Sequence, residues 1–474
     1  MILSRTHRLP LSTMGAAVLR PSGLLLPIRQ VFSTTILVLV LNLGTGLITA
    51  RLLGPAGRGE LTAMVLWPGF VAGLLTLGLQ RALTYTLASR RGEPPCLILV
   101  GLLLTLCTGL LAAGLGALLV PIWLDGYSPQ VVTFSQWAML LVPVTLLLRS
   151  ANAVLQAHGD FTLYNRNRYV PPLVSLVVLA TLASCGFLSP FTAALAVIGP
   201  PLPLLVANLV WIARTHQPRF CEPADSSREL LSYGLRSCGK DVVDTLAKEI
   251  DRIVLIGLVS PSALGLYVVA KSLAQPVIAL PSAIVAVLFP EASRVEVKDA
   301  VTLVTRAARV SMAVGCPLGL ALVFAAPPLL ELLYGTAFAA AAGPFRILLI
   351  DAILMGFSSI LMQAFMGSGR PGVVTALLGL GLLVNVLGLV LFVPTFGLLG
   401  AALAVLISTI VRLGFLLLCF PLVLNMRPPS PLPRRQDVEW LWTVESSKAN
   451  TGPAGVMSRS PIKSGSQGAS KPET

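Results

Sequence analysis

Residues 97–123 read LILVGLLLTLCTGLLAAGLGALLVPIW and contain no charged side chain. A helix needs about 20 apolar residues to cross a hydrocarbon core roughly 30 Å thick, so this run is long enough to span a membrane. Comparable runs recur from residue 31 to residue 424 and are apolar on all faces. The strands of a membrane barrel would instead alternate apolar and polar residues over about 10 positions. The sequence therefore predicts an all-α, polytopic membrane protein.

The overall composition agrees with a chain whose solvent is lipid. Of its 474 residues, 55% are hydrophobic and only 11% are charged, and the mean hydropathy is +0.85. Soluble domains carry about 25% charged residues. The formal charge of +14 lies mostly in short loops between apolar runs and in the tails, with few interleaved aromatic residues. This distribution is typical of the positive-inside rule rather than of a nucleic-acid surface, so we expect no nucleic acid partner.

The apolar runs predict about twelve transmembrane helices in two pseudo-symmetric six-helix lobes. They lie near residues 31–50, 61–83, 97–123, 131–155, 169–188 and 191–213 in the first lobe, and 230–258, 263–290, 309–334, 341–367, 373–394 and 398–424 in the second. The predicted organisation is a cytoplasmic extension (1–30), a first lobe (31–214), a cytoplasmic linker (215–229), a second lobe (230–427) and a cytoplasmic tail (428–474). The tail is rich in Pro, Ser, Lys and Gly, a composition that buries no core, so we expect it to be disordered.

Basic residues assign a side to each connection. With both termini in the cytoplasm, the loops on the cytoplasmic side contain Arg90, Arg91, Arg166, Arg168, Arg214, Arg219, Arg228, Arg294, Lys298, Arg306, Arg309, Arg370, Arg427, Arg434 and Arg435. Only Arg51 and Arg58 lie near loops on the opposite side, which satisfies the positive-inside rule. The first 30 residues show no convincing signal-peptide core or cleavage site, and Met14 is an alternative start.

Two pairs of short segments indicate an internal duplication. LLGPAGRGE at residues 52–60 and LVSPSALGL at residues 258–266 each follow the first span of their lobe, and Pro55 and Gly59 match Pro261 and Gly265. After the fourth span of each lobe, Gln-Ala at 156–157 precedes Gly-Asp at 159–160, and Gln-Ala at 363–364 precedes Gly-Arg at 369–370. Duplicated halves are common in transporters, although Pro and Gly also punctuate unrelated membrane hairpins.

The sequence resembles a known family in three stretches. LLGPAGRGE, IDRIVLIGLVSPSALGLYVVAKSLA (250–274) and LFPEASR (288–294) look like the Wzx-like polysaccharide transporters, which share a superfamily with multidrug and toxin extrusion (MATE) transporters and lipid II flippases. The resemblance implies two lobes around a central cavity that alternates between inward-open and outward-open states in the bacterial cytoplasmic membrane. The implied substrate is a polyprenyl-pyrophosphate-linked oligosaccharide, such as an O-antigen, capsule or exopolysaccharide unit. Implied partners are membrane lipid and polysaccharide polymerase or assembly proteins.

The seventh predicted span carries charges where lipid makes them costly. At about 100° per residue, Asp241, Asp244, Lys248, Asp251 and Arg252 fall within a stripe about 100° wide, so this face should border an aqueous cavity. Pairing at i,i+4 spacing within the helix is a competing explanation that is compatible with the first. Guanidinium and ammonium groups suit phosphate oxygens. We therefore predict substrate-binding cations at Arg51, Lys240, Lys248, Arg252 and Lys271, and ion-coupling carboxylates at Asp241, Asp244 and Asp251.

Two other functions remain as alternatives. A MATE-like, cation-coupled exporter of drugs or small molecules is expected to hold a carboxylate deep in a helix, and the acids of the first lobe lie at loops or span ends. Asp241 and Asp244 leave this alternative open from the second lobe. A polytopic glycosyltransferase or ligase is less favoured, because the predicted external loops are short and offer few acids or bases. We expect a transporter and no enzyme.

Several motifs are interpreted as coincidences. GLRSCGKD at residues 234–241 is close to a nucleotide-binding P-loop, but Asp241 replaces the required Ser or Thr and the segment opens a membrane helix. We expect no nucleotide and no cofactor. The seven cysteines are scattered and predict no disulfide framework. His7, His158 and His216 lie near span ends without a second ligand type nearby, so we expect no metal.

Overall fold

The described part of the chain is helical throughout. The computed structural model describes residues 21–89, 96–217, 223–292 and 297–430, and every regular element in these ranges is a helix. The elements are α1 (Pro21–Leu74), α2 (Leu79–Ser89), α3 (Cys96–Trp123), α4 (Pro129–Ala138), α5 (Leu141–Ala157), α6 (Phe161–Ser184), α7 (Pro190–Ile198), α8 (Pro201–His216), α9 (Pro223–Leu258), α10 (Pro261–Ala292), α11 (Val297–Phe324), α12 (Ala326–Tyr334), η1 (Thr336–Ala341), α13 (Ala342–Gly367) and α14 (Pro371–Leu424). The predicted all-α class is confirmed.

Eight helical stretches in the described residues are long and apolar enough to cross a membrane. Two of them are bent, α1 at Gly54 and α14 at Gly397, where φ is 67° and 56°. Glycine adopts such angles readily and other residues rarely do, so each bend separates two rods. Counting both rods of α1 and of α14, and adding the long but more polar α6 and α9, gives twelve membrane-length segments. This agrees with the predicted number.

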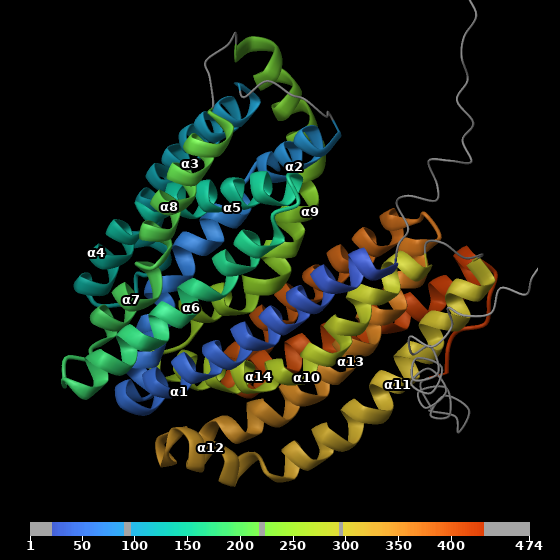
Figure 1. Ribbon diagram of the computed structural model, residues 1–474. Coiled ribbons are helices and arrows are strands. Elements are labelled where there is room, and N and C mark those ends of the chain that lie inside the picture. The colour runs from blue at the N-terminus through green and yellow to red at the C-terminus, as the bar shows by residue number, and fades with distance from the viewer. Residues whose placement is uncertain (1–20, 90–95, 218–222, 293–296, 431–474) are drawn as a thin grey trace, which may run out of the picture.

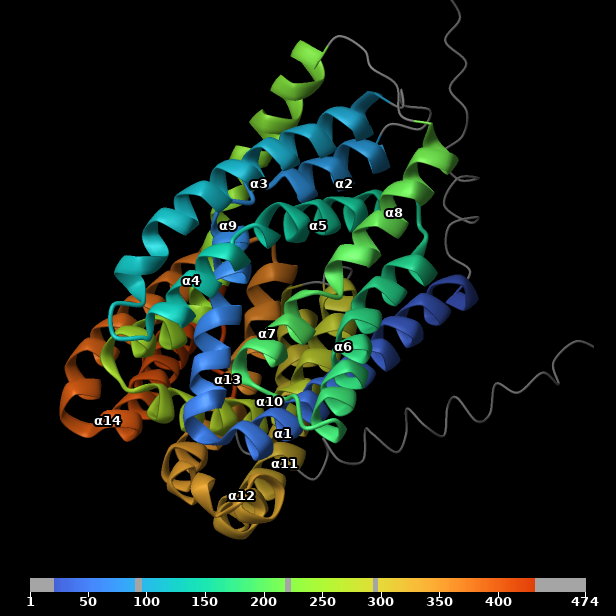
Figure 2. The ribbon, with the colours of Figure 1, turned by 90° about the vertical axis from the view of Figure 1, so that its left-hand side faces the viewer.

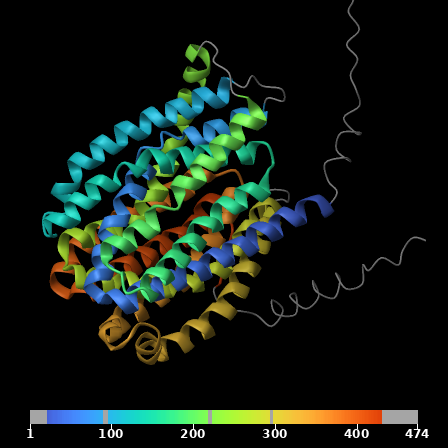
Figure 3. The ribbon, with the colours of Figure 1, turned by 60° about the vertical axis from the view of Figure 1, so that its left-hand side comes forward.

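The helices form two groups, with α9 between them. Figure 1 shows α2–α8 on one side and α10–α14 on the other, and Figure 2 shows the same division from a second direction. In Figure 3 most of the long helices run along a common direction. α9 packs against α2 and α3 of the first group and against α14 of the second, while α1 packs against both α6 and α10. α1 and α9 therefore join the two groups.

The Pro-Gly motif and its repeat meet at one end of the molecule. This end, where α1 bends at Gly54 and α9 passes into α10, is called the gate end below. A Cβ atom added to Gly59 would lie 1.7 Å from the carbonyl oxygen of Pro261, and one added to Gly265 would lie 1.9 Å from the carbonyl oxygen of Pro55. No side chain fits at such distances, so glycine is required at both positions. The residues matched in the sequence thus contact each other reciprocally across the two groups.

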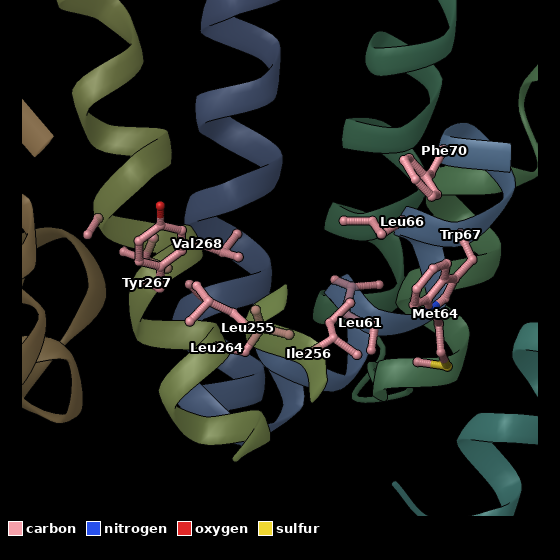
Figure 4. Close-up of a cluster of buried hydrophobic side chains, with 14 of the residues drawn as sticks. Leu61, Met64, Leu66, Trp67, Phe70, Leu255, Ile256, Leu264, Tyr267 and Val268 are labelled. Atoms are coloured by element: carbon pink, nitrogen blue, oxygen red, sulfur yellow. The ribbon is translucent and has the colours of Figure 1, made fainter. Parts of the chain in front are cut away.

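A buried apolar cluster seals the gate end beside this contact. Leu61 and Trp67 of α1 belong to the same cluster as Leu255 of α9 and Leu264 and Val268 of α10. In Figure 4 Leu61, Leu255 and Leu264 lie between Val268 on one side and Trp67 on the other. Burying large apolar side chains stabilises such a contact by about 1.5–3 kcal/mol each relative to water. The gate end is therefore closed by packing as well as by the two glycines.

The second pair of matched segments ends a helix in the same way in both halves, but the residues align differently from the match seen in the sequence. Gly159 and Gly369 adopt φ of 76° and 72°, and in both turns the next amide donates a 2.9 Å hydrogen bond to the carbonyl five residues before it. This bond belongs to a common way of ending a helix with glycine. The shared hydrogen bonds align Gln156 with Met366, so the predicted match of Gln156 with Gln363 is wrong by about one helical turn.

Some predicted spans differ in detail from the helices. The predicted span at 309–334 is two helices, because α11 ends at Phe324 and α12 follows from Ala326 with two prolines in its first turn. α11 begins at Val297, earlier than expected, since the exposed Lys298 and Asp299 are charged and the hydropathy pattern omitted them. The predicted span at 61–83 is interrupted between α1 and α2, where Leu77 and Gly78 have positive φ.

Cys96 is disulfide-bonded, although the scattered cysteines of the sequence indicated no disulfide framework. Cysteines brought together by folding across distant helices leave no spacing signature in the sequence. Five others in the described part of the chain are free thiols: Cys107, Cys185, Cys238, Cys316 and Cys419. Residues 1–20 and 431–474 lie outside the described ranges, so most of the predicted extension and tail does too.

Candidate functional site

A cavity of about 1220 Å³ lies between the first group of helices and α9. Its walls come from the second rod of α1, from α2, α5 and α6, and from one face of α9. It extends from Tyr85 and Tyr233, near the end at which α2 stops and α9 starts, to Val65 and Arg252 nearer the gate end. The end of the cavity with Tyr85 and Tyr233 is called the basic end below. A volume of this size accommodates a ligand larger than a typical drug.

Four residues of the predicted stripe on α9 line this cavity: Asp241, Asp244, Lys248 and Arg252. They recur at spacings of three and four residues, which places them on one helical face. Lys248 is exposed to the cavity, and Arg252 is half-buried with an ion pair to Glu249 at 3.0 Å. Glu249 also lines the cavity, although the sequence analysis did not select it. The charged face of α9 therefore forms one wall.

The fifth member of the stripe, Asp251, is turned away from this cavity toward α10. It is only 2% exposed, it accepts a 2.6 Å hydrogen bond from the Tyr267 hydroxyl, and it forms an ion pair with Lys271. Figure 4 shows the Tyr267 hydroxyl pointing out of the apolar cluster. Lys271 does not line the cavity either. These two candidates thus neutralise each other at the contact of α9 with α10.

The remaining candidates are placed as follows. Arg51 is exposed near the gate end and lines none of the described cavities. Lys240 lies on α9, and its side chain is not among the described ones. The GLRSCGKD segment lies inside the uninterrupted helix α9, where a phosphate-binding loop has no room to form. No group of three potential metal ligands occurs among the described residues.

Cations of the first group of helices were underestimated by the sequence analysis. Arg81 of α2 forms an ion pair with Asp241 across the cavity, and Arg149 of α5 also lines it. Neither residue was among the cations that the sequence predicted to bind substrate. A useful signal was available for Arg149, because Asn152 and Gln156 follow it at i+3 and i+7 on the same helical face and also line the cavity.

A smaller cavity of about 240 Å³ adjoins Arg252 nearer the gate end. Arg58 lines it and donates a 2.9 Å hydrogen bond from Nη1 to Oγ1 of Thr49. The Nε atoms of Arg58 and Arg252 are buried and have no hydrogen-bond partner among the described residues. Unsatisfied buried donors of this kind favour an anionic or strongly polar ligand. Arg58 had been noted only as a loop residue, because its span was predicted to start at residue 61.

Comparison with known proteins places this geometry in context. The profile of the family described as "Polysaccharide biosynthesis protein" matches residues 48–343, more than half of the chain. An uncharacterised membrane protein of Methanocaldococcus jannaschii is 27% identical over 183 residues, which make up 37% of this chain. That match spans only 36% of the archaeal protein's length.

Solved structures of similar shape are transporters. The lipid II flippase MurJ in an inward-closed conformation superimposes with a TM-score of 0.71 and 12% identity, covering 90% of this chain and 94% of MurJ. An inward-facing multidrug resistance MATE transporter gives a TM-score of 0.66 and 15% identity, with 81% and 95% covered. A transporter of the same superfamily from Pyrococcus furiosus gives 0.54 and 15%, with 82% and 93% covered. At these identities the likeness establishes the fold alone.

Proposed function

Since the chain belongs to the family of polysaccharide biosynthesis proteins, we propose that it moves a polyprenyl-pyrophosphate-linked oligosaccharide across a membrane by alternating access. The observation that carries this proposal is the cavity of about 1220 Å³ lined by Lys248, Arg252, Arg81 and Arg149 and closed at the gate end. A pyrophosphate in this cavity would meet guanidinium and ammonium groups that bind its oxygens well. The lipid tail would stay in the bilayer between the two groups of helices.

The proposed orientation has the basic end in the cytoplasm. The short connections at this end carry most of the loop arginines, and the gate-end connections carry few. With both termini in the cytoplasm of a bacterial cell, the cavity would receive the lipid-linked sugar on the side where it is made. The division into a first lobe at 31–214 and a second at 230–427 remains part of the proposal. The first half of α9 packs on α2, however, so we place the moving boundary within α9.

Ion coupling at Asp241, Asp244 and Asp251 is a further part of the proposal. Asp251 already accepts from Lys271 and Tyr267, so a coupling cation there would have to displace an ammonium group. Asp241, which is paired with Arg81, and Asp244 both face the cavity, where a cation could reach them. They also support the alternative function of a cation-coupled drug exporter. We propose no catalytic role for any residue, and we propose polysaccharide polymerase or assembly proteins as partners that receive the product.

The test is restoration of surface polysaccharide in a bacterial strain that lacks its own flippase. Native protein should restore it, and Lys248→Ala or Arg252→Ala should lower it at least tenfold, because a charge-assisted hydrogen bond is worth about 1.5–3 kcal/mol. Arg51→Ala is the matched control and should behave as native, since Arg51 is exposed and lies outside the cavity.

Two outcomes would contradict the proposal. Normal polysaccharide with both alanine variants, at equal membrane expression, would remove these cations from the binding site. Efflux of a cationic dye from cells that express the native protein, without any transport of lipid-linked sugar into the outer leaflet of proteoliposomes, would favour the drug-exporter alternative.

A further inference from the structure

The cavity has a second wall that the phosphate proposal does not use. Opposite the charged face of α9, the first group of helices presents neutral side chains that form hydrogen bonds, called the neutral wall below: Gln80, Thr84, Asn152, Gln156 and Tyr164. Gln80 and Thr84 are four residues apart on α2, and Asn152 and Gln156 are four residues apart on α5. This spacing puts each pair on one helical face, so two polar ridges run side by side along the cavity.

Two amide side chains of the neutral wall are in a condition that favours ligand binding. The Asn152 Oδ1 atom accepts a 2.7 Å hydrogen bond from Nδ2 of Asn167, a buried residue of α6, and this bond fixes the orientation of the Asn152 amide. The Nε2 atom of Gln80 is buried and has no hydrogen-bond partner among the described residues. A donor in this condition costs about 1–3 kcal/mol unless a ligand or water satisfies it. Amide groups in fixed orientations are suited to recognise hydroxyl groups.

Two tyrosines continue the neutral wall at the basic end. Tyr85 of α2 and Tyr233 of α9 stack with ring centroids 4.5 Å apart and an interplanar angle of 9°. They remain 56% and 37% exposed, and both line the cavity. The pair thus offers flat apolar surface next to polar hydroxyls. A sugar ring has the complementary chemistry, with C–H groups on its faces and hydroxyls around its edge.

We infer that the neutral wall and the tyrosine pair bind the sugar of the lipid-linked substrate. The inference rests on the proposed function and assigns the two ends of the substrate to different walls. The pyrophosphate lies against Lys248 and Arg252 of α9, and the sugar lies against α2, α5 and the stacked tyrosines. Arg81 and Arg149 lie beside this subsite on the same two helices.

The test compares two ligands that differ only in the sugar. Binding of polyprenyl pyrophosphate, and of the same lipid carrying one N-acetylhexosamine, is measured with purified protein in detergent. Native protein should bind the sugar-bearing lipid more tightly. Gln156→Leu and Tyr85→Ala should each weaken that binding about tenfold and leave binding of the bare lipid unchanged, because they remove contacts to the sugar alone. The matched control Gln130→Leu, at an exposed position on α4 outside this cavity, should change neither.

The outcomes separate this inference from the proposed function. Equal native affinity for both lipids, or equal weakening of both in Gln156→Leu and Tyr85→Ala, would overturn the sugar subsite and leave the phosphate site standing. Loss of all lipid binding in Arg252→Ala with the sugar preference intact in Gln156→Leu would also overturn it. Failure of native protein to bind either lipid would overturn the proposed function, and this inference with it.

Discussion

The ion pair between Asp251 of α9 and Lys271 of α10 is deeply buried. Asp251 is 2% exposed, and the Lys271 side chain is 18% exposed. A charge in this environment is tolerated only while it is paired and hydrogen-bonded, and the Tyr267 hydroxyl supplies the additional bond to Asp251. The pair therefore joins α9 to α10 and fixes their relative rotation.

Removal of one partner should destabilise the protein more than removal of both. Lys271→Met leaves the Asp251 carboxylate buried without its cation, which costs about 3–5 kcal/mol and should lower the apparent melting temperature in detergent by several degrees. Asp251→Asn combined with Lys271→Met should recover most of the loss. Lys298→Met, at an exposed position on α11, is the control and should melt as native protein does. A double variant no more stable than Lys271→Met would contradict the pairing.

The sequence located the charged helix correctly but did not separate its two charge environments. Asp251 and Arg252 are adjacent, so helical periodicity placed both on the same stripe, yet one contacts α10 and the other lines the cavity. Adjacent residues differ by about 100° around a helix, and the distinction depends on where the neighbouring helices pack. Arg81 was missed for the same reason, since its partner Asp241 is distant in sequence. Such contacts are set by tertiary packing and not by local pattern.

At the scale of elements, α9 is held by both groups of helices at different points along its length. Its first half contacts α2 through the Arg81–Asp241 ion pair and the stacked Tyr85 and Tyr233, and its second half contacts α10 through Asp251. α9 is a single uninterrupted helix between these contacts. A change in the position of one group is therefore transmitted along α9 to the other, while the charged face of α9 stays in the cavity wall.

Reversal of the charge at Arg81 tests whether its ion pair attaches α9 to α2. Arg81→Asp places two carboxylates opposite each other and should reduce transport several-fold, because like charges at short range repel. Arg81→Asp combined with Asp241→Arg should restore transport, since the pair is re-formed with opposite polarity and a carboxylate remains at this point of the cavity for ion coupling. The effect on stability should stay below about 1 kcal/mol, because the pair is partly exposed. Transport is measured with fluorescent lipid-linked sugar in proteoliposomes.

The exchange of Arg81 and Asp241 has a control variant and a result that would contradict it. Arg166→Asp, at an exposed position on α6 outside the cavity, should leave transport unchanged. If the exchanged pair were as inactive as Arg81→Asp, then Arg81 or Asp241 would act on the substrate individually and not by holding α9 to α2.

The number and order of the spans were predictable, and their bends were less so. Apolar runs give the spans because lipid requires each to be long and continuous. The bends at Gly54 and Gly397 fall where the sequence predicted short connections, but each connection is a single non-helical glycine between two rods and not a longer loop. α12 and η1 at the gate end were hidden within or beside a predicted span, because their residues are as apolar as the span itself.

At the scale of the whole molecule, the duplicated motif brings the two groups of helices into contact at the gate end. Gly59 faces the Pro261 carbonyl, and Gly265 faces the Pro55 carbonyl, so the contact has the reciprocity of a two-fold axis. The sequence revealed the matching residues but not that they touch. In the proposed alternating-access cycle this contact forms and breaks, because the cavity would have to open toward the gate end to release its substrate.

A single methyl group at either glycine should therefore hold the gate end apart. Gly59→Ala or Gly265→Ala would place a Cβ within 2 Å of a carbonyl oxygen, and the rigid backbone on the other side leaves separation of the helices as the available response. We expect folded protein whose transport falls more than tenfold. Thr62→Cys, introduced after the free thiols are replaced by serine, should react with a membrane-impermeant thiol reagent from the gate side much faster in these variants than in the native background.

Gly46→Ala and Gly257→Ala are matched controls, because a Cβ at either position meets nothing within 4 Å, and they should keep both native transport and slow labelling. Unchanged labelling and transport in Gly59→Ala and Gly265→Ala would show that the helices absorb the methyl group elsewhere and that this contact does not form the gate.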